Sequence, residues 1–222
     1  YSGLFGMKHA TGMEETVDAY TFRLMENEMS RNGKKAEVYS QDILDKYKNG
    51  VDGYRDWDWI DLYMNKLAFA TSHTLSVRGG SDKVKYFVSA GYNRDNGLLK
   101  SGVQYYERFT FRSNLTAELT KGLTMNVKVA GRWDQTQRPR EDFMWTFKTL
   151  LVNDRGVGPY AIGSTDHYSD IAPESKNAAA LVNPDKDGYR RNRGVNYSAD
   201  VDLTWKVPFV DGLSIGVLGS FN

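Results

Sequence analysis

Apolar and polar side chains alternate with a period of two residues over long stretches of this chain. Within residues 107–119, for example, Phe109 and Phe111 share one parity, whereas Arg108 and Arg112 take the other. Because successive side chains of a β-strand point to opposite faces, this pattern predicts strands with one apolar and one mostly polar face. Related alternation is found in residues 1–8, 74–78, 84–93, 123–134, 195–206 and 213–221.

The lengths of these segments and of their connections favour a membrane barrel. Several segments reach the ~9–11 residues that a strand needs to cross a bilayer, whereas strands of soluble proteins commonly have about 5–6 residues. Short and long connections alternate, as they do in outer-membrane barrels with periplasmic turns and extracellular loops. The short connections are 79–83, 120–122 and 207–212, and the long ones are 95–104 and 135–194.

Aromatic side chains lie at both ends of the alternating segments. Tyr92, Tyr105 and Trp133 share the apolar parity next to long connections, and Trp205 and Phe209 lie near a short turn. Two aromatic girdles, one at each interface, are typical of a barrel in lipid. A soluble β-sandwich with aromatic residues near the ends of its core is the alternative interpretation.

Composition excludes several classes of function. The net charge is +1, which provides no basic face for nucleic acid, and the absence of cysteine excludes disulfides and thiolate metal sites. The three histidines are scattered without metal-ligand spacing, and no nucleophile motif is present. No apolar run long enough for a transmembrane helix occurs. We therefore expect neither an enzyme nor a cofactor.

The first part of the chain contains two helical patterns. One extends from about Glu14 to Asn32, with Glu14, Glu15 and Asp18 in its first turn, and a shorter one begins near Ser40 and ends at Asn49. We expect both helices to belong to a large extracellular loop. The sequence Asp-Trp-Asp-Trp at 56–59 follows them.

Several strings resemble the SusC/RagA family of TonB-dependent transporters. The segment 73–81 (HTLSVRGGS) leads into 85–92 (KYFVSAGY), Gly97 follows, and 108–114 (RFTFRSN) comes next. The helical stretch and the Asp-Trp motif precede these strings in the order that the family shows. The resemblance covers roughly residues 15–135, and the remainder fits a barrel without a family signature.

The resemblance implies an all-β fold, in which this chain is a fragment of a large antiparallel transmembrane β-barrel of about 22 strands, with short helices in long extracellular loops. It further implies active import of oligosaccharides, peptides or similar nutrients across the bacterial outer membrane. The implied partners are a SusD-like lipoprotein lid, TonB, outer-membrane lipid and the nutrient itself. TonB would act through an N-terminal region and plug that this chain lacks.

One barrel domain is expected for 1–222. Its parts are an extracellular loop at about 9–70, strands at 71–134, a long extracellular loop at 135–194 and strands at 195–222. A non-transporting barrel such as an adhesin, or a soluble carbohydrate-binding β-sandwich, remains an alternative. We expect the chain to be a segment of a longer protein.

Aromatic residues on the long loops are candidates for substrate contact, since their rings can stack on sugars or on peptide side chains. They are Trp57, Trp59, Trp145, Tyr160, Tyr168 and Tyr189. The alternative is that they pack their own loops or contact the lid, above all Trp57 and Trp59. Arg190, Arg191 and Arg193 form a basic cluster for which solvation or contact with acidic lipopolysaccharide is favoured over an anionic substrate.

Overall fold

The computed structural model describes residues 1–13, 15–170 and 176–222. Its strands form one seven-stranded sheet in the order β1 to β7, and each strand pairs antiparallel with the next. The strands are β1 (Ser2–Lys8), β2 (Ala68–Gly80), β3 (Val84–Asn96), β4 (Tyr105–Thr120), β5 (Leu123–Pro139), β6 (Tyr189–Lys206) and β7 (Ser214–Phe221). The helices are α1 (Ala19–Asn32), α2 (Gln41–Lys48), α3 (Trp59–Tyr63), α4 (Phe143–Val152) and α5 (Ala178–Leu181).

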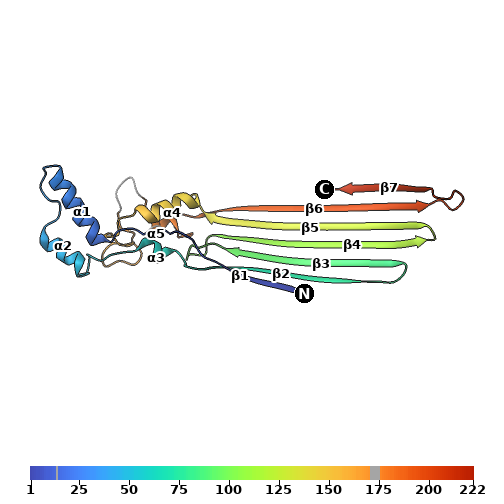
Figure 1. Ribbon diagram of the computed structural model, residues 1–222, viewed down its shortest axis with the longest axis horizontal. Helices are drawn as coiled ribbons and strands as arrows, with labels where there is room; N and C mark the ends of the chain where they lie inside the picture. The colour runs from blue at the N-terminus through green and yellow to red at the C-terminus, as the bar shows by residue number, and fades with distance from the viewer. Residues whose placement is uncertain (14, 171–175) are drawn as a thin grey trace.

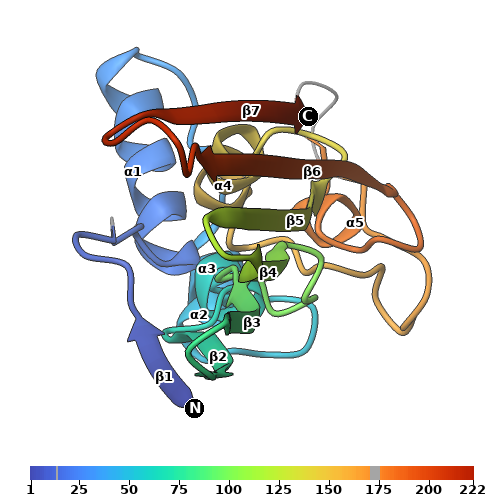
Figure 2. The same cartoon turned by 90° about the vertical axis from the view of Figure 1, so that its right-hand side faces the viewer.

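All helices lie at one end of the sheet (Figure 1). The tight turns 81–83 and 121–122 and the connection 207–213 lie at the other end, so the short and long connections separate as the alternation of loop lengths predicts. Seen along the strands, the sheet is a single curved layer with β1 and β7 at its two edges (Figure 2). This is the expected wall of an antiparallel barrel, and it is open because only part of such a barrel is described.

The register places the apolar parity of every long strand on one face. Tyr92, Phe109, Trp133 and Val195 stand opposite one another in one row across β3 to β6. Many side chains on this face are exposed, and Phe109 and Phe111, for example, are 48% and 46% exposed. A β-sandwich needs a second sheet on this face, and the described strands all belong to one sheet. The described strands therefore do not form a sandwich, and the uncovered apolar face matches the outer face of a membrane barrel.

The apolar stretch has the height of a membrane. Ten residue steps separate Val195 from Trp205 on β6 (205 − 195 = 10). At ~3.3 Å per residue they span about 33 Å, which a strand tilt of ~40° reduces to about 25 Å, the height of the apolar band of a barrel. Trp133 contacts Phe109 at one end, with ring centroids 5.4 Å apart, and Trp205 contacts Phe209 at the other, at 6.3 Å.

Tyr105 lies outside the girdle in which the sequence pattern groups it. It stands opposite Gln137, in the second row beyond the aromatic row of Trp133 on the same face. Its hydroxyl donates to the Gln137 side chain at 3.2 Å and accepts from Gln135 at 2.8 Å. Parity alone does not reveal this difference in height, because parity fixes the face and not the position along the strand.

Several polar side chains on the opposite face of the sheet pair with one another. Thr116 donates to Asn126 at 2.8 Å, and Asn126 donates to Asp202 at 3.0 Å. Arg132 lies 2.9 Å from Asp134 on the same strand. Charged groups at these positions agree with the wet lumen of a wide barrel and not with a packed core.

The strands and helices differ from the sequence expectation at their ends. β5 continues to Pro139 and β6 begins at Tyr189, because pairs such as Gln135–Arg193 prolong the ladder after the apolar alternation has ended. α1 begins at Ala19, not near residue 14, since the Asp18 side chain accepts from Thr21 N at 2.7 Å and caps it. Glu15 therefore precedes the helix, and Glu14 lies outside the described residues.

No helix in the described ranges is both long and apolar enough to cross a membrane.

Substitution of Val201, which lies near the middle of the apolar stretch, tests the lipid-facing assignment. We expect Val201→Arg to lower the free energy of unfolding by about 2–4 kcal/mol, because it places a charge near the bilayer midplane. The matched control Ser198→Arg lies on the polar face of the same strand, and its effect should stay below ~1 kcal/mol. Denaturant titration of the full-length protein in lipid vesicles measures both. Equal losses from the two variants would contradict the assignment.

Candidate functional site

The three long connections share one hydrophobic core at the end of the sheet. Residues from the β1–β2, β3–β4 and β5–β6 connections meet there, and Trp59, Leu99 and Leu150 are each 1–2% exposed. Further members are Met64, Val103, Ala178, Ala179 and Val182. Because segments far apart in the chain bury their side chains together, the connections form one packed layer that can hold a binding site in shape.

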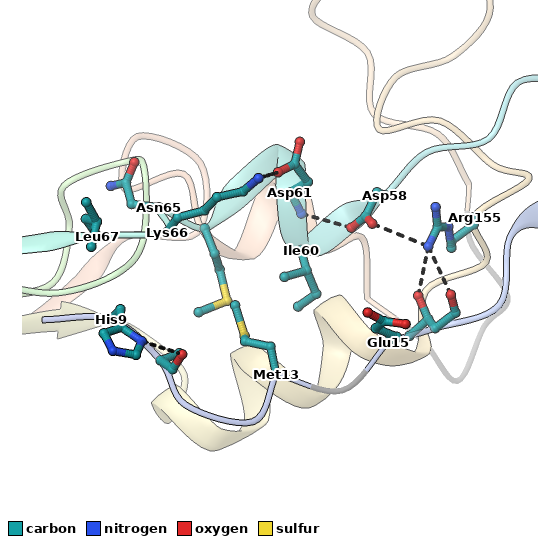
Figure 3. A pocket seen from close by; sticks show the side chains of 13 residues that line it. His9, Met13, Glu15, Asp58, Ile60, Asp61, Asn65, Lys66, Leu67 and Arg155 are labelled. Carbon is teal, nitrogen blue, oxygen red and sulfur yellow. Dashed lines mark hydrogen bonds and ion pairs between the residues drawn. The ribbon is translucent and has the colours of Figure 1, made fainter.

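Arg155 ties the β5–β6 connection to the β1–β2 connection. Its guanidinium donates twice to the Asp56 carboxylate, once at 2.9 Å, and lies 3.3 Å from Asp58. It also donates to the carbonyl and hydroxyl oxygens of Thr16, each at 3.1 Å. The hydrogen bond to Asp56 raises the pKa of Arg155 above its ordinary value. Figure 3 shows Arg155 facing Asp58 at the edge of a hollow.

The preceding residue, Asp154, makes the reciprocal contact. Its carboxylate accepts from Arg23 of α1, whose side chain is 5% exposed and lies between the rings of Tyr39 and Tyr47, 5.1 and 5.3 Å from their centroids. Burial alone would lower the pKa of Arg23, but the hydrogen bond and charge of Asp154 outweigh it and raise the pKa. Asp154–Arg155, which we call the interlock, therefore joins two loops through charges of both signs.

One hollow of about 760 Å³ lies between α3 and the segments 9–13 and 15–16 (Figure 3). Its charged groups largely pair with each other, as Lys66 does with Asp61 at 3.7 Å and Arg155 with Asp58. Apolar side chains complete the lining, and they are Met13, Ile60, Met64 and Leu67. We call it the charged hollow. Pairing within the lining leaves little charge for a ligand.

A second hollow of about 430 Å³ is lined by aromatic rings, and we call it the aromatic hollow. Trp57, Tyr63 and Tyr160 contribute the rings. The polar groups come from Ser164 and from Arg55 and Asp52, which lie 3.4 Å apart. Apolar walls around a few polar groups are typical of sites for small molecules or short segments of polymers. Burial raises the pKa of the Tyr63 phenol above its ordinary value.

Contacts with neighbouring residues hold the rings of the aromatic hollow in place. Tyr160 stacks on Tyr168 with centroids 5.1 Å apart, and the Tyr168 hydroxyl accepts from Asn183 at 3.1 Å. Trp57 lies so close to Gly158 that a Cβ there would sit 3.0 Å from the indole, so a side chain at 158 would push the ring away. The Trp57 backbone N–H donates to the Arg155 carbonyl at 2.8 Å, which connects the hollow to the interlock.

The structure separates the six aromatic candidates. Trp57 and Tyr160 line the aromatic hollow, and Tyr168 supports it from behind. Trp59 is 1% exposed in the shared core, where its indole donates to the Asp154 carbonyl at 3.1 Å, so it cannot contact a ligand in this arrangement. The remaining two lie apart from the hollow: Trp145 on α4 is 44% exposed and Tyr189 on β6 is 46% exposed.

Sequence reasoning missed Tyr63 and Ile162, which also line the aromatic hollow. Tyr63 follows the Asp-Trp motif by a few residues, and its helical spacing from Trp59, on which it stacks at 5.9 Å, is the only signal that points to it. For Ile162 the sequence contains no comparable signal.

Comparison with known proteins gives relatives of one kind. SusC, a TonB-dependent receptor of Bacteroides thetaiotaomicron, is 33% identical over 94 residues, which are 39% of this chain and 9% of SusC. TonB-dependent receptor P3 of Formosa agariphila is 31% identical over 84 residues, which are 38% of this chain and 8% of that receptor. The matched part thus spans less than a tenth of these relatives. No family model matches the chain.

Among solved structures, the RagAB peptide transporter matches 98% of this chain and 27% of the RagAB chain, with a TM-score of 0.66 and 14% sequence identity. The RagAB peptide importer in its closed-closed state matches over the same shares with a TM-score of 0.58. At such low identity the match shows the fold, which is that of a RagAB barrel segment. These relatives are receptors and transporters rather than enzymes. Sequence and fold together show that this chain is similar to one section of the TonB-dependent outer-membrane receptors of the SusC and RagA type.

Proposed function

We propose that the whole protein imports nutrients across the bacterial outer membrane and that this chain forms part of its barrel wall and extracellular mouth. The observation that carries the proposal is the combination of a membrane-high apolar face with a packed loop layer at one end. Oligosaccharides, peptides or similar compounds are the proposed cargo. A TonB-coupled plug outside this chain would supply the energy, so the work of these residues is binding and release rather than bond making.

The aromatic hollow is the proposed contact for the cargo. Its rings lie beside Arg55 and Ser164, so a ligand with an apolar face and polar edges, such as a sugar ring or a peptide side chain with its amide, matches the lining. The charged hollow is a weaker candidate because, among the described residues, no Trp, Tyr or Phe ring lines it.

The exposed surface of helix α1 favours contact with a protein partner at the mouth. We propose that this partner is a SusD-like lipoprotein lid. The side that α1 buries carries Arg23 and Asn27, whereas Phe22, Met25 and Met29 are 41%, 52% and 68% exposed. Spacings of three and four residues place these three apolar side chains along one stripe of the helix. In Figure 1, α1 and α2 lie farthest from the sheet, where a lid would meet the loops.

Deletion of the full-length gene tests transport itself. Cells without it should lose growth on, or uptake of, at least one member of a panel of oligosaccharides and peptides too large for porins. Restoring the gene should restore the uptake. Unchanged uptake of the whole panel would instead favour a non-transporting barrel such as an adhesin.

Substitutions in the aromatic hollow test the contact. We expect Trp57→Ala and Tyr160→Ala each to weaken the apparent affinity for the imported compound about 2–10-fold, since a stacked ring contributes roughly 0.5–1.5 kcal/mol. Concentration-dependent uptake by complemented cells measures this change. Trp145→Ala is the control, because that ring is exposed outside the hollow and its loss should leave uptake unchanged. The contact assignment fails if all three variants behave alike.

The interlock can be tested by removing one charge. Asp154→Asn removes one of the two carboxylates that pair with the buried Arg23 guanidinium and leaves only Glu26 of the same helix, which should loosen α1 from the β5–β6 connection and expose the residues around it. Limited proteolysis of the full-length protein should then cleave within 15–55 several-fold faster than in the parent protein. Asp185→Asn changes an exposed carboxylate of the same connection that forms no ion pair among the described residues, and it should leave the cleavage rate unaltered.

A further inference from the structure

The outward face of β6 changes from apolar to basic within two residues. Val195, Tyr197 and the following odd-numbered residues form the apolar stretch, whereas the next outward positions toward the loops are Arg193 and Arg191. Both arginines are exposed. They stand in the two rows beyond the aromatic row of Trp133, where the outer leaflet gives way to its head groups.

Buried glutamines hold these two arginines in place. Arg193 Nε donates to Gln135 Oε1 at 2.8 Å, and Arg191 Nε donates to Gln137 Oε1 at 2.9 Å. The glutamines are 6% and 7% exposed, and their own amide groups donate to the Tyr105 hydroxyl and the Val103 carbonyl. Each amide is thereby oriented with its oxygen toward a guanidinium.

A neutral acceptor positions a guanidinium without neutralising it. Across the described residues, neither Arg191 nor Arg193 lies within ion-pair distance of a carboxylate, whereas Arg94 in the row of Arg193 pairs with Glu107. Both Nη groups of Arg193 and one of Arg191 make no side-chain hydrogen bond in that part of the chain. Two positive charges with unused donors thus face outward at the edge of the membrane.

We propose that Arg191 and Arg193 bind the phosphate group of an outer-leaflet lipid. A phosphate accepts the parallel N–H groups of guanidinium, and basic residues just outside the apolar zone attract anionic head groups. A soluble substrate is a poor match, because these side chains share the lipid-facing parity and not that of the lumen. Arg190 has the opposite parity and stands opposite Arg138, so it takes no part. The inference rests on the membrane placement of the sheet and not on transport.

The experiment uses the full-length protein reconstituted in phosphatidylcholine nanodiscs that contain a small fraction of bisphosphorylated lipid A. Native mass spectrometry after detergent release counts the lipid A that each protein retains. We expect the double variant Arg191→Gln/Arg193→Gln to reduce retention on the order of ten-fold. The matched control Arg190→Gln should retain lipid A like the parent protein, and so should Arg191→Lys/Arg193→Lys, which keeps both charges.

The proposal is overturned if the double glutamine variant retains as much lipid A as the parent protein, or if Arg190→Gln loses as much as the double variant. It is also overturned if the parent protein retains dephosphorylated lipid A equally well. Complete displacement of lipid A by millimolar inorganic phosphate would indicate a free-phosphate site instead. If the double glutamine variant does not fold, the parent protein provides the test. Its retention of bisphosphorylated lipid A must fall as the salt concentration rises, whereas its retention of dephosphorylated lipid A must not depend on salt. Uptake should persist in the folded variants, so this test can fail while the transport proposal stands.

Discussion

The structure depends on one constraint, which is that backbone N–H and C=O groups inside lipid must find partners within the protein. The antiparallel ladder meets this constraint for β3, β4 and β5, whereas the outer edges of β2 and β6 are paired only over 68–74 and 199–206. The outer edges of β1 and β7 need further strands to meet it, which a closed barrel supplies. The match to the RagAB barrel over 27% of that chain agrees with this requirement.

Beyond the apolar stretch of the strands the protein is surrounded by water, and apolar side chains there are buried inside the protein. The ladder of β5 and β6 continues through polar pairs such as Gln137–Arg191, but apolar residues now gather in the loop layer around Trp59 and Leu150. Charged residues can be buried there only with partners, and the interlock supplies them by pairing Arg23 with Asp154 and Arg155 with Asp56. The loop layer therefore has a hydrophobic core of its own at one end of the sheet.

The proposed functional surfaces lie in two different environments, which are the loop layer and the outward face of the sheet. The loop layer holds the aromatic hollow, and Trp57 is fixed there by its hydrogen bond to the interlock. The outward face of the sheet carries an aromatic girdle and, just beyond it, the arginines that the buried glutamines orient. The proposed cargo contact and the proposed lipid contact thus lie on separate surfaces of the protein.

Alternation in the sequence determined which side chains face lipid and which face the lumen, because strand geometry gives each parity one face. It also located every strand of the sheet and, through the family strings, the kind of barrel. Only the tertiary structure decided how far β5 and β6 extend, that Trp59 is buried while Trp57 lines a hollow, and that Tyr105 lies outside the girdle. Asp154 and Arg155 looked like ordinary loop residues in the sequence. Their partners lie some hundred or more residues away, and no local pattern records contacts that the path of the chain creates.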